Sequence, residues 1–183
     1  MHRYVKNTNG TLRNTKKVFF EQLEKMLNEA EKNKEQVIIT AHHPMYTNGE
    51  HSKGKQPWRF LLNYTPFFIF GLKGGYDYLS QDLAQPKYKH FRRPMLALIN
   101  KHNNVLYASG HEHNLQFFNA DGHKYIVSGC GSKLTPLQNK KKFDSVFQDD
   151  TKTGFVKLVY EPAGNHKTII YRVGEEPKLL EGF

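Results

Sequence analysis

Cysteine is nearly absent from this chain of 183 residues. Its single member, Cys130, excludes an internal disulfide and a cysteine-based zinc site, so any metal would depend on imidazole and carboxylate ligands. Cys130 lies in a Gly-Cys-Gly turn with no base suggested beside it. We therefore expect a packed structural thiol rather than a nucleophile.

Long apolar runs are also missing. The best candidate, residues 65–72, is broken by a proline and falls short of the roughly 18 to 20 apolar residues that a membrane helix needs. The first residues include His2, Arg3 and Lys6 without an apolar segment, which is not the pattern of a signal peptide. We therefore expect no transmembrane segment. A hydrophobic content of 38% is enough for one domain over residues 1–183.

Acidic residues are few, with 17 Asp and Glu against 27 Lys and Arg and a net charge of +10. Such a surface attracts phosphorylated substrates, and equally nucleic acid or anionic lipid. The only tight basic cluster is Lys140-Lys141-Lys142, within a polar segment, Pro136 to Asp150, that we expect to be a solvated loop. No named nucleic-acid-binding motif occurs, so no specific nucleic-acid partner is predicted.

The chain does contain histidine pairs directly after predicted strands. Residues 37–41 form a β-branched apolar run that is typical of a buried strand, and His42-His43-Pro44 follows it. Residues 105–109 lead in the same way to Gly110-His111-Glu112-His113. Central strands of an open α/β sheet end at the edge where such sheets carry their ligands. We therefore expect these histidines to converge and to form a metal-centred site.

The rest of the chain shows helix and strand patterns. A helix capped by Asn14 or Thr15 is expected to run to about Lys32, and a second helix over residues 88–102 is expected to bend or restart at Pro94. The first helix should bury one apolar stripe, consisting of Phe19, Leu23, Met26, Leu27 and Ala30. Further strands are expected at residues 115–118, 124–128, 154–160 and 167–173, with turns at Asp121-Gly122 and at residues 163–165.

Residues 42–86 predict a long irregular stretch, because glycines and prolines recur in it. Aromatic residues concentrate between Trp58 and Tyr78. We favour a self-packed lid for this cluster, and the alternatives are a wall of a substrate pocket or a contact for another segment.

These residues carry a family resemblance. The segments 41–46, 49–51 and 110–116 (Ala-His-His-Pro-Met-Tyr, Gly-Glu-His and Gly-His-Glu-His-Asn-Leu-Gln) resemble the C-terminal motifs of calcineurin-like metallophosphoesterases, most closely the purple acid phosphatase branch. His51 follows His42 by nine residues, as the substrate-contacting histidine does in that branch. The resemblance covers most of the chain.

The resemblance implies an α/β fold, the C-terminal half of a four-layer α/β/β/α sandwich. The family's N-terminal motifs are an Asp-x-His or Asp-x-Gly, a Gly-Asp whose carboxylate bridges two metals, and a Gly-Asn-His-Asp or Gly-Asn-His-Glu, and none of these precedes His42 here. We therefore expect residues 1–183 to be the C-terminal part of such a domain. Its N-terminal metal-binding half would be the missing partner.

The resemblance also implies a reaction, the hydrolysis of a phosphate monoester or diester by a dinuclear centre of iron, zinc or manganese. His42 and His111 would bind one metal and His113 the other. His51 would contact the phosphate and protonate the leaving alcohol. Asn114 would orient His113. His43 occupies a variable position before Pro44, and Glu112 lies between His111 and His113, so neither is predicted to bind metal.

Without the missing carboxylates, the three histidines are expected to hold one metal weakly. The alternative function is a non-catalytic module, truncated or basic, that contacts polyanions through its charge. Purple-acid-phosphatase-like enzymes are commonly exported, so the resemblance favours an exported or periplasmic location. The remaining histidines are expected at the surface, namely His2, His90, His102, His123 and His166.

Overall fold

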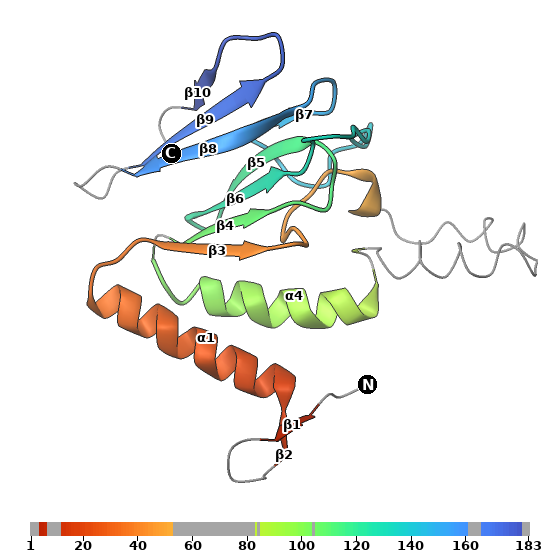
Figure 1. Ribbon diagram of the computed structural model, residues 1–183. Coiled ribbons are helices and arrows are strands. Elements are labelled where there is room, and N and C mark those ends of the chain that lie inside the picture. The colour runs from red at the N-terminus through yellow and green to blue at the C-terminus, as the bar shows by residue number, and fades with distance from the viewer. Residues whose placement is uncertain are drawn as a thin grey trace, which may run out of the picture.

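The computed structural model describes residues 4–6, 12–52, 83, 85–103, 105–160 and 166–180. His2, the aromatic cluster between Trp58 and Tyr78 and the turn at residues 163–165 lie outside these residues. The described elements form a mixed α/β structure in three layers, with two helices, a five-stranded sheet and a three-stranded sheet (Figure 1). Neither described helix combines the length and the apolar character that a membrane span requires.

The five-stranded sheet has the order β3-β4-β6-β5-β7. Strands β3, β4 and β6 are parallel, whereas β5 runs antiparallel to both β6 and β7. The carboxyl ends of β3, β4 and β6 therefore meet at one edge of the sheet, and the loops that follow them are neighbours. The strands are Val37–Ala41 (β3), Val105–Ser109 (β4), Leu115–Ala120 (β5), His123–Ser128 (β6) and Phe147–Asp149 (β7).

Strand β3 corrects one prediction, because it lies at the edge of the sheet rather than at its centre. Among the strands that the structure describes, only β4 pairs with it. Ile38 is 43% exposed as a result. A β-branched apolar run predicts a strand, but it does not distinguish a central strand from an edge strand whose outer side is open.

The second sheet packs on one face of the first. It is antiparallel in the order β10-β9-β8, with bounds Gly154–Tyr160 (β8), His166–Arg172 (β9) and Lys178–Leu180 (β10). The shared core includes Leu115, Phe117 and Ile170. Cys130 is fully buried in it, and burial raises the pKa of the thiol. The prediction of a packed thiol is confirmed.

Two helices, α1 (Thr15–Lys32) and α4 (Pro86–Ile99), cover the other face of the five-stranded sheet (Figure 1). Helix α1 begins and ends where the sequence predicts. Leu27 and Ala30 are buried, but Met26 is 66% exposed and Phe19 is 43% exposed, so the prediction that both lie on the buried stripe was wrong. The surface that the sheet and α4 cover is narrower than the predicted stripe.

Helix α4 runs through Pro94 without restarting, contrary to one expectation. Proline has no N–H, so the carbonyl of His90, four residues earlier, loses its helical partner. The Lys16 ammonium of α1 donates a hydrogen bond to that carbonyl at 2.6 Å. A contact between the two helices thus satisfies the acceptor that the proline leaves open.

Two histidines expected at the surface, His102 and His123, are buried. His102 Nδ1 lies 3.0 Å from a carboxylate oxygen of Glu31, and His123 Nδ1 accepts a hydrogen bond from the Val105 amide at 3.4 Å. Both imidazoles have polar partners distant in sequence, which makes their burial tolerable. His90 is exposed as expected, and His166 is half-buried.

Short elements escaped prediction. They are β1 (Tyr4–Lys6) and β2 (Leu12–Asn14), which pair with each other, and β7, β10 and the 3-10 helix Glu50–Ser52. Strand β7 lies inside residues 136–150, so that segment is not simply a solvated loop. The predicted turn at Asp121-Gly122 is confirmed, because both residues have positive φ, 53° and 79°, and join β5 to β6 as a tight hairpin.

Candidate metal centre

The site begins where β3 and β4 end side by side. Ala41 pairs with Ser109 at the last position of this parallel ladder, and the Gly110 amide donates to the His42 carbonyl at 3.2 Å. The pairing continues into the side chains, where His42 Nε2 and His111 Nδ1 lie 3.1 Å apart. The structure therefore brings two of the predicted ligands together.

The backbone at His111 is strained. Its φ is +68°, a conformation that non-glycine residues adopt rarely and at a cost of about 1–3 kcal/mol. The Glu112 amide donates to the Gly110 carbonyl at 2.8 Å, which closes a three-residue turn with His111 at its apex. This turn directs the buried His111 imidazole back toward His42. Strain of this kind is concentrated at functional sites.

A third imidazole joins this pair. The candidate ligand nitrogens of His42, His43 and His111 all lie within 4.8 Å of one another. The sequence pattern predicts no metal-binding role for His43, yet the structure places it within this group. Its backbone is anchored, since the Tyr107 hydroxyl donates to the His43 carbonyl at 3.0 Å.

The next two carbonyls of this loop are anchored as well. The Tyr88 hydroxyl donates to the Pro44 carbonyl, and the Arg92 guanidinium donates to the Met45 carbonyl. Both donors come from helix α4. The helix therefore holds the loop that carries two of the clustered imidazoles, in addition to covering the sheet. Sequence patterns gave no signal of this role.

His51 and His113 flank the cluster. His51 lies in the 3-10 helix, and its ring centroid is 4.7 Å from that of His111. His113 is half-buried and stands outside the group of three. Its Nδ1 atom is buried and forms no hydrogen bond within the described part of the chain. An imidazole nitrogen with these properties is chemically suited to receive a metal ion.

Asn114 is fully buried but bonds away from the His113 ring. Its amide donates to the Thr135 carbonyl at 3.3 Å and accepts from Gln116 at 2.7 Å. Thr135 in turn exchanges two hydrogen bonds with the backbone of His113, at 2.9 Å and 3.2 Å. The hydrogen bonds of Asn114 thus reach the His113 backbone through Thr135, a residue for which the sequence pattern predicts no role.

Burial favours the neutral form of two imidazoles of the site, His43 and His113. It lowers the pKa of His43, and the neighbouring charges of His42 and His51 lower that pKa further. Burial also lowers the pKa of His113, followed by the positive charge of Lys133 and of the same two histidines. Neutral imidazole is the form that binds a metal ion. These two imidazoles are thus disposed toward metal binding.

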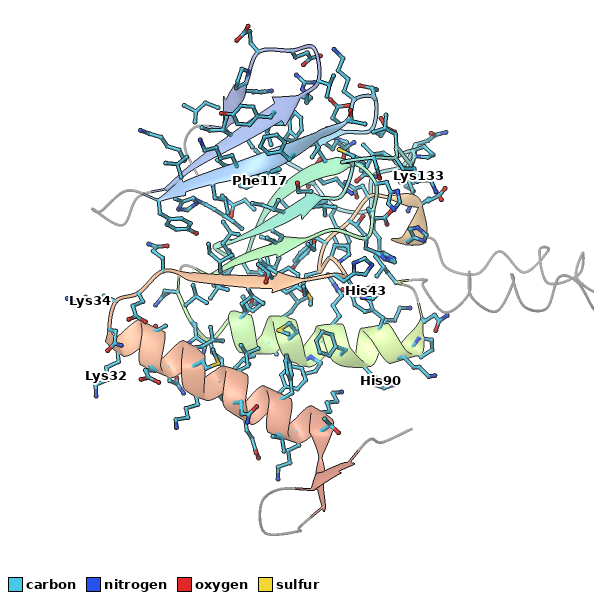
Figure 2. All side chains as sticks on the ribbon, in the orientation of Figure 1. Lys32, Lys34, His43, His90, Phe117 and Lys133 are labelled. Atoms are coloured by element: carbon cyan, nitrogen blue, oxygen red, sulfur yellow. The ribbon has the colours of Figure 1, made fainter. Side chains whose placement is uncertain are left out.

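Lys133 belongs to the same end of the molecule. Figure 2 shows it and His43 at the edge where β3 and β4 end, with Lys34 at the opposite end. Lys133 is exposed, and the hydrogen bonds between Thr135 and His113 hold its loop against the site. An exposed cation here can contact an anion that enters the site.

The histidines fit a metal ion. Two nitrogens bound tetrahedrally to one zinc ion at about 2.0–2.1 Å lie roughly 3.3 Å apart, close to the 3.1 Å between His42 and His111. No carboxylate from the described residues belongs to this group of three histidines. Its imidazoles suit zinc, iron or manganese, and a dinuclear centre would need oxygen ligands in addition.

Comparisons with known proteins find similarity among solved structures. No family model matches the sequence, and no match was found among curated proteins. The crystal structure of a dimetal phosphatase from Danio rerio is similar with a TM-score of 0.46 and 14% sequence identity, over 87% of this chain and 36% of that chain. The present chain thus spans far less than the length of that phosphatase. A similarity this distant carries no argument about activity, which has to come from the residues themselves.

Proposed function

We propose that this chain is part of a metal-dependent phosphoesterase of the calcineurin-like superfamily, in its purple acid phosphatase branch. The observation that carries the proposal is the 3.1 Å separation of His42 Nε2 and His111 Nδ1, at the edge of the sheet where parallel strands end. The motifs around both residues resemble that branch, and the spacing from His42 to His51 agrees with it.

In this proposal His42 and His111 hold one ion, with the His43 ring beside them, and His113 holds a second. When bound, such ions supply Lewis-acid chemistry for phosphate-ester hydrolysis. His51 contacts the phosphate and gives a proton to the leaving alcohol, which is the role of a general acid. Its ring is close enough to His111 to reach a substrate held at the cluster.

The carboxylate ligands come from the proposed partner, an N-terminal half of the same domain. Of the strands in the described ranges only β4 pairs with β3, and the edge left open there supports this arrangement. A parallel strand added there would end beside His42, because β3 itself ends at Ala41. Exposed Ile38 would be covered in the process. The 183 residues alone would hold one ion weakly and turn over little substrate.

The test uses the longest natural polypeptide that contains this sequence. Bound metal is measured by mass spectrometry and hydrolysis is measured with an aryl phosphate, for wild type, His111→Ala, His113→Ala and the exposed control His90→Ala. We expect two metals in wild type, loss of metal in the first two variants and at least about a hundredfold loss of activity. Unchanged activity in both His111→Ala and His113→Ala would overturn the proposal.

A second candidate function is a binding module for polyanions, which the net charge of +10 favours. It predicts binding to heparin or single-stranded DNA that weakens steeply with salt. That binding would be unchanged in His111→Ala and His113→Ala. The two candidates are thus separated by the same pair of variants.

A further inference from the structure

We propose that Glu112, the residue between the two histidines of the motif, is a positioning residue that locks together the three loops of the metal site. This inference rests on the proposed function. The loops follow β3, β4 and β6, at residues 42–49, 110–114 and 129–135. Glu112 is 0% exposed and meets the other two loops at different atoms.

The packing around Glu112 leaves no space for a side chain on either neighbour. A Cβ atom at Gly49 would lie 2.2 Å from Glu112 Oε2, and a Cβ atom at Gly129 would lie 2.1 Å from the Glu112 carbonyl oxygen. Atoms that are not bonded cannot approach so closely. Glycine at both positions is therefore a requirement of this contact, and the carboxylate itself fills the space at Gly49.

The Thr47 hydroxyl fixes the direction of the carboxylate. Thr47 Oγ1 accepts hydrogen bonds from the Gly49 amide at 2.8 Å and from Gln116 Nε2 at 3.1 Å. Both of its lone pairs are then occupied, so its proton is available to Glu112 Oε1 at 3.3 Å. One hydroxyl thus ties the loop after β3 to the loop after β4.

The chain of hydrogen bonds extends from Thr47 to His113. Gln116 Nε2 also donates to Asn114 Oδ1, Asn114 Nδ2 donates to the Thr135 carbonyl, and Thr135 bonds the His113 backbone in both directions. The side chains are buried along its whole length. Buried polar networks with directed partners hold a single arrangement, because a displaced member would lose a hydrogen bond without gaining water.

This network explains how the strained turn at His111 persists. A residue with φ of +68° relaxes unless its surroundings hold it. Glu112 follows His111 directly; its carboxylate accepts a hydrogen bond from Thr47 and packs against Gly49, and its carbonyl packs against Gly129. The anchor at residue 112 therefore holds His111 toward His42 on one side and His113 toward the site on the other.

The test measures Co²⁺ binding to the 183-residue chain by its visible absorption, together with the melting temperature. Gly49→Ala forces a Cβ into the Glu112 carboxylate, whereas Gly131→Ala, on the third loop, adds a Cβ where nothing lies within 4 Å. We expect about tenfold weaker Co²⁺ binding and a changed spectrum for Gly49→Ala, and wild-type behaviour for Gly131→Ala.

A second matched pair covers the case in which Gly49→Ala does not fold. Thr47→Val removes the hydroxyl at nearly constant volume, and Thr47→Ser restores it. Weakened Co²⁺ binding in the first and recovery in the second support the inference. Unchanged affinity and spectrum in folded Thr47→Val would overturn it, whatever the melting temperature does. A wild-type chain that binds no Co²⁺ would instead overturn the proposed function, and the inference with it.

Discussion

His42 Nε2 lies 3.1 Å from His111 Nδ1, across 69 positions of the chain. Without a metal this is the distance of an N–H···N hydrogen bond, in which one nitrogen donates the proton and the other accepts it. A cation bound to both nitrogens would take the place of that proton. The geometry therefore suits either one shared proton or one metal ion at this pair.

Removal of either imidazole should weaken metal binding by the isolated chain. We expect His42→Ala or His111→Ala to raise the Kd for Zn²⁺ by at least about tenfold, because one of two adjacent donors is lost. Competition with a chromophoric chelator measures the change. His90→Ala, an exposed histidine on α4, is the control. Equal affinities in all three variants would show that zinc binds elsewhere.

Because φ at His111 is positive, we expect the glycine variant at this position to be more stable than the alanine variant, which reverses the usual order. We expect His111→Gly to be more stable than His111→Ala by about 1 kcal/mol, because glycine adopts this conformation without steric cost. Urea unfolding measures the difference. At His113, which is not among the residues with positive φ, His113→Gly should be less stable than His113→Ala. The same order at both positions would contradict the strained turn.

Asp149 predicts a pH dependence of stability. Burial raises the pKa of this carboxyl, but hydrogen bonds from Thr151 and Arg172 outweigh that effect and hold the pKa below its ordinary value. A depressed pKa stabilises the folded state above the unfolded-state pKa, and this contribution is lost as the pH falls through the folded-state value. Stability should therefore decrease below about pH 4.

The variant Asp149→Asn tests this assignment. We expect it to lower the free energy of unfolding at pH 7 by about 1–3 kcal/mol, and the gap to wild type should narrow as the pH falls below 4. Urea unfolding at pH 7 and pH 3 gives both values. Asp144→Asn makes the same chemical change at an exposed position and should have little effect. A gap that is constant with pH would exclude this role for the charge.

The exposed position of Lys133 beside the histidines predicts that its charge contributes to anion binding. In the longest natural polypeptide, Lys133→Gln should raise the KM for an aryl phosphate roughly two- to fivefold with little change in kcat, as expected for an exposed ion pair. Lys34→Gln removes the same charge at the opposite end of the molecule (Figure 2). Steady-state kinetics at low salt separate the two variants. Equal effects would mean that Lys133 acts only through net charge.

The regular core of the fold was predictable from the sequence. Strands β4 and β8 and helix α1 have the predicted bounds, since each combines a clear periodicity with turn or capping residues at its ends. Strands β7 and β10 are three residues long, too short for a periodicity. The fourth layer of the expected sandwich remains a prediction, because both described helices cover the same face (Figure 1).

The site was predictable only in part. The approach of His42 to His111 follows from two strand ends at one edge of a parallel sheet, which alternation and β-branching reveal. The inclusion of His43 and the contact of Gly49 with Glu112 depend on the path of irregular loops. Buried polar residues such as Gln116 carry no periodic signal, because their partners lie elsewhere in the chain.

The parallel pairing of β3 with β4 has a kinetic consequence. Parallel neighbours require a long crossover, so the chain must close a large loop before this ladder forms any contact. Non-local pairings of this kind slow folding. The His42–His111 pair exists only after β3 and β4 have joined, so zinc should bind no species that precedes this step. Added zinc should therefore slow unfolding without accelerating folding. The metal-binding pair of histidines would then form late in folding and stabilise the folded state kinetically.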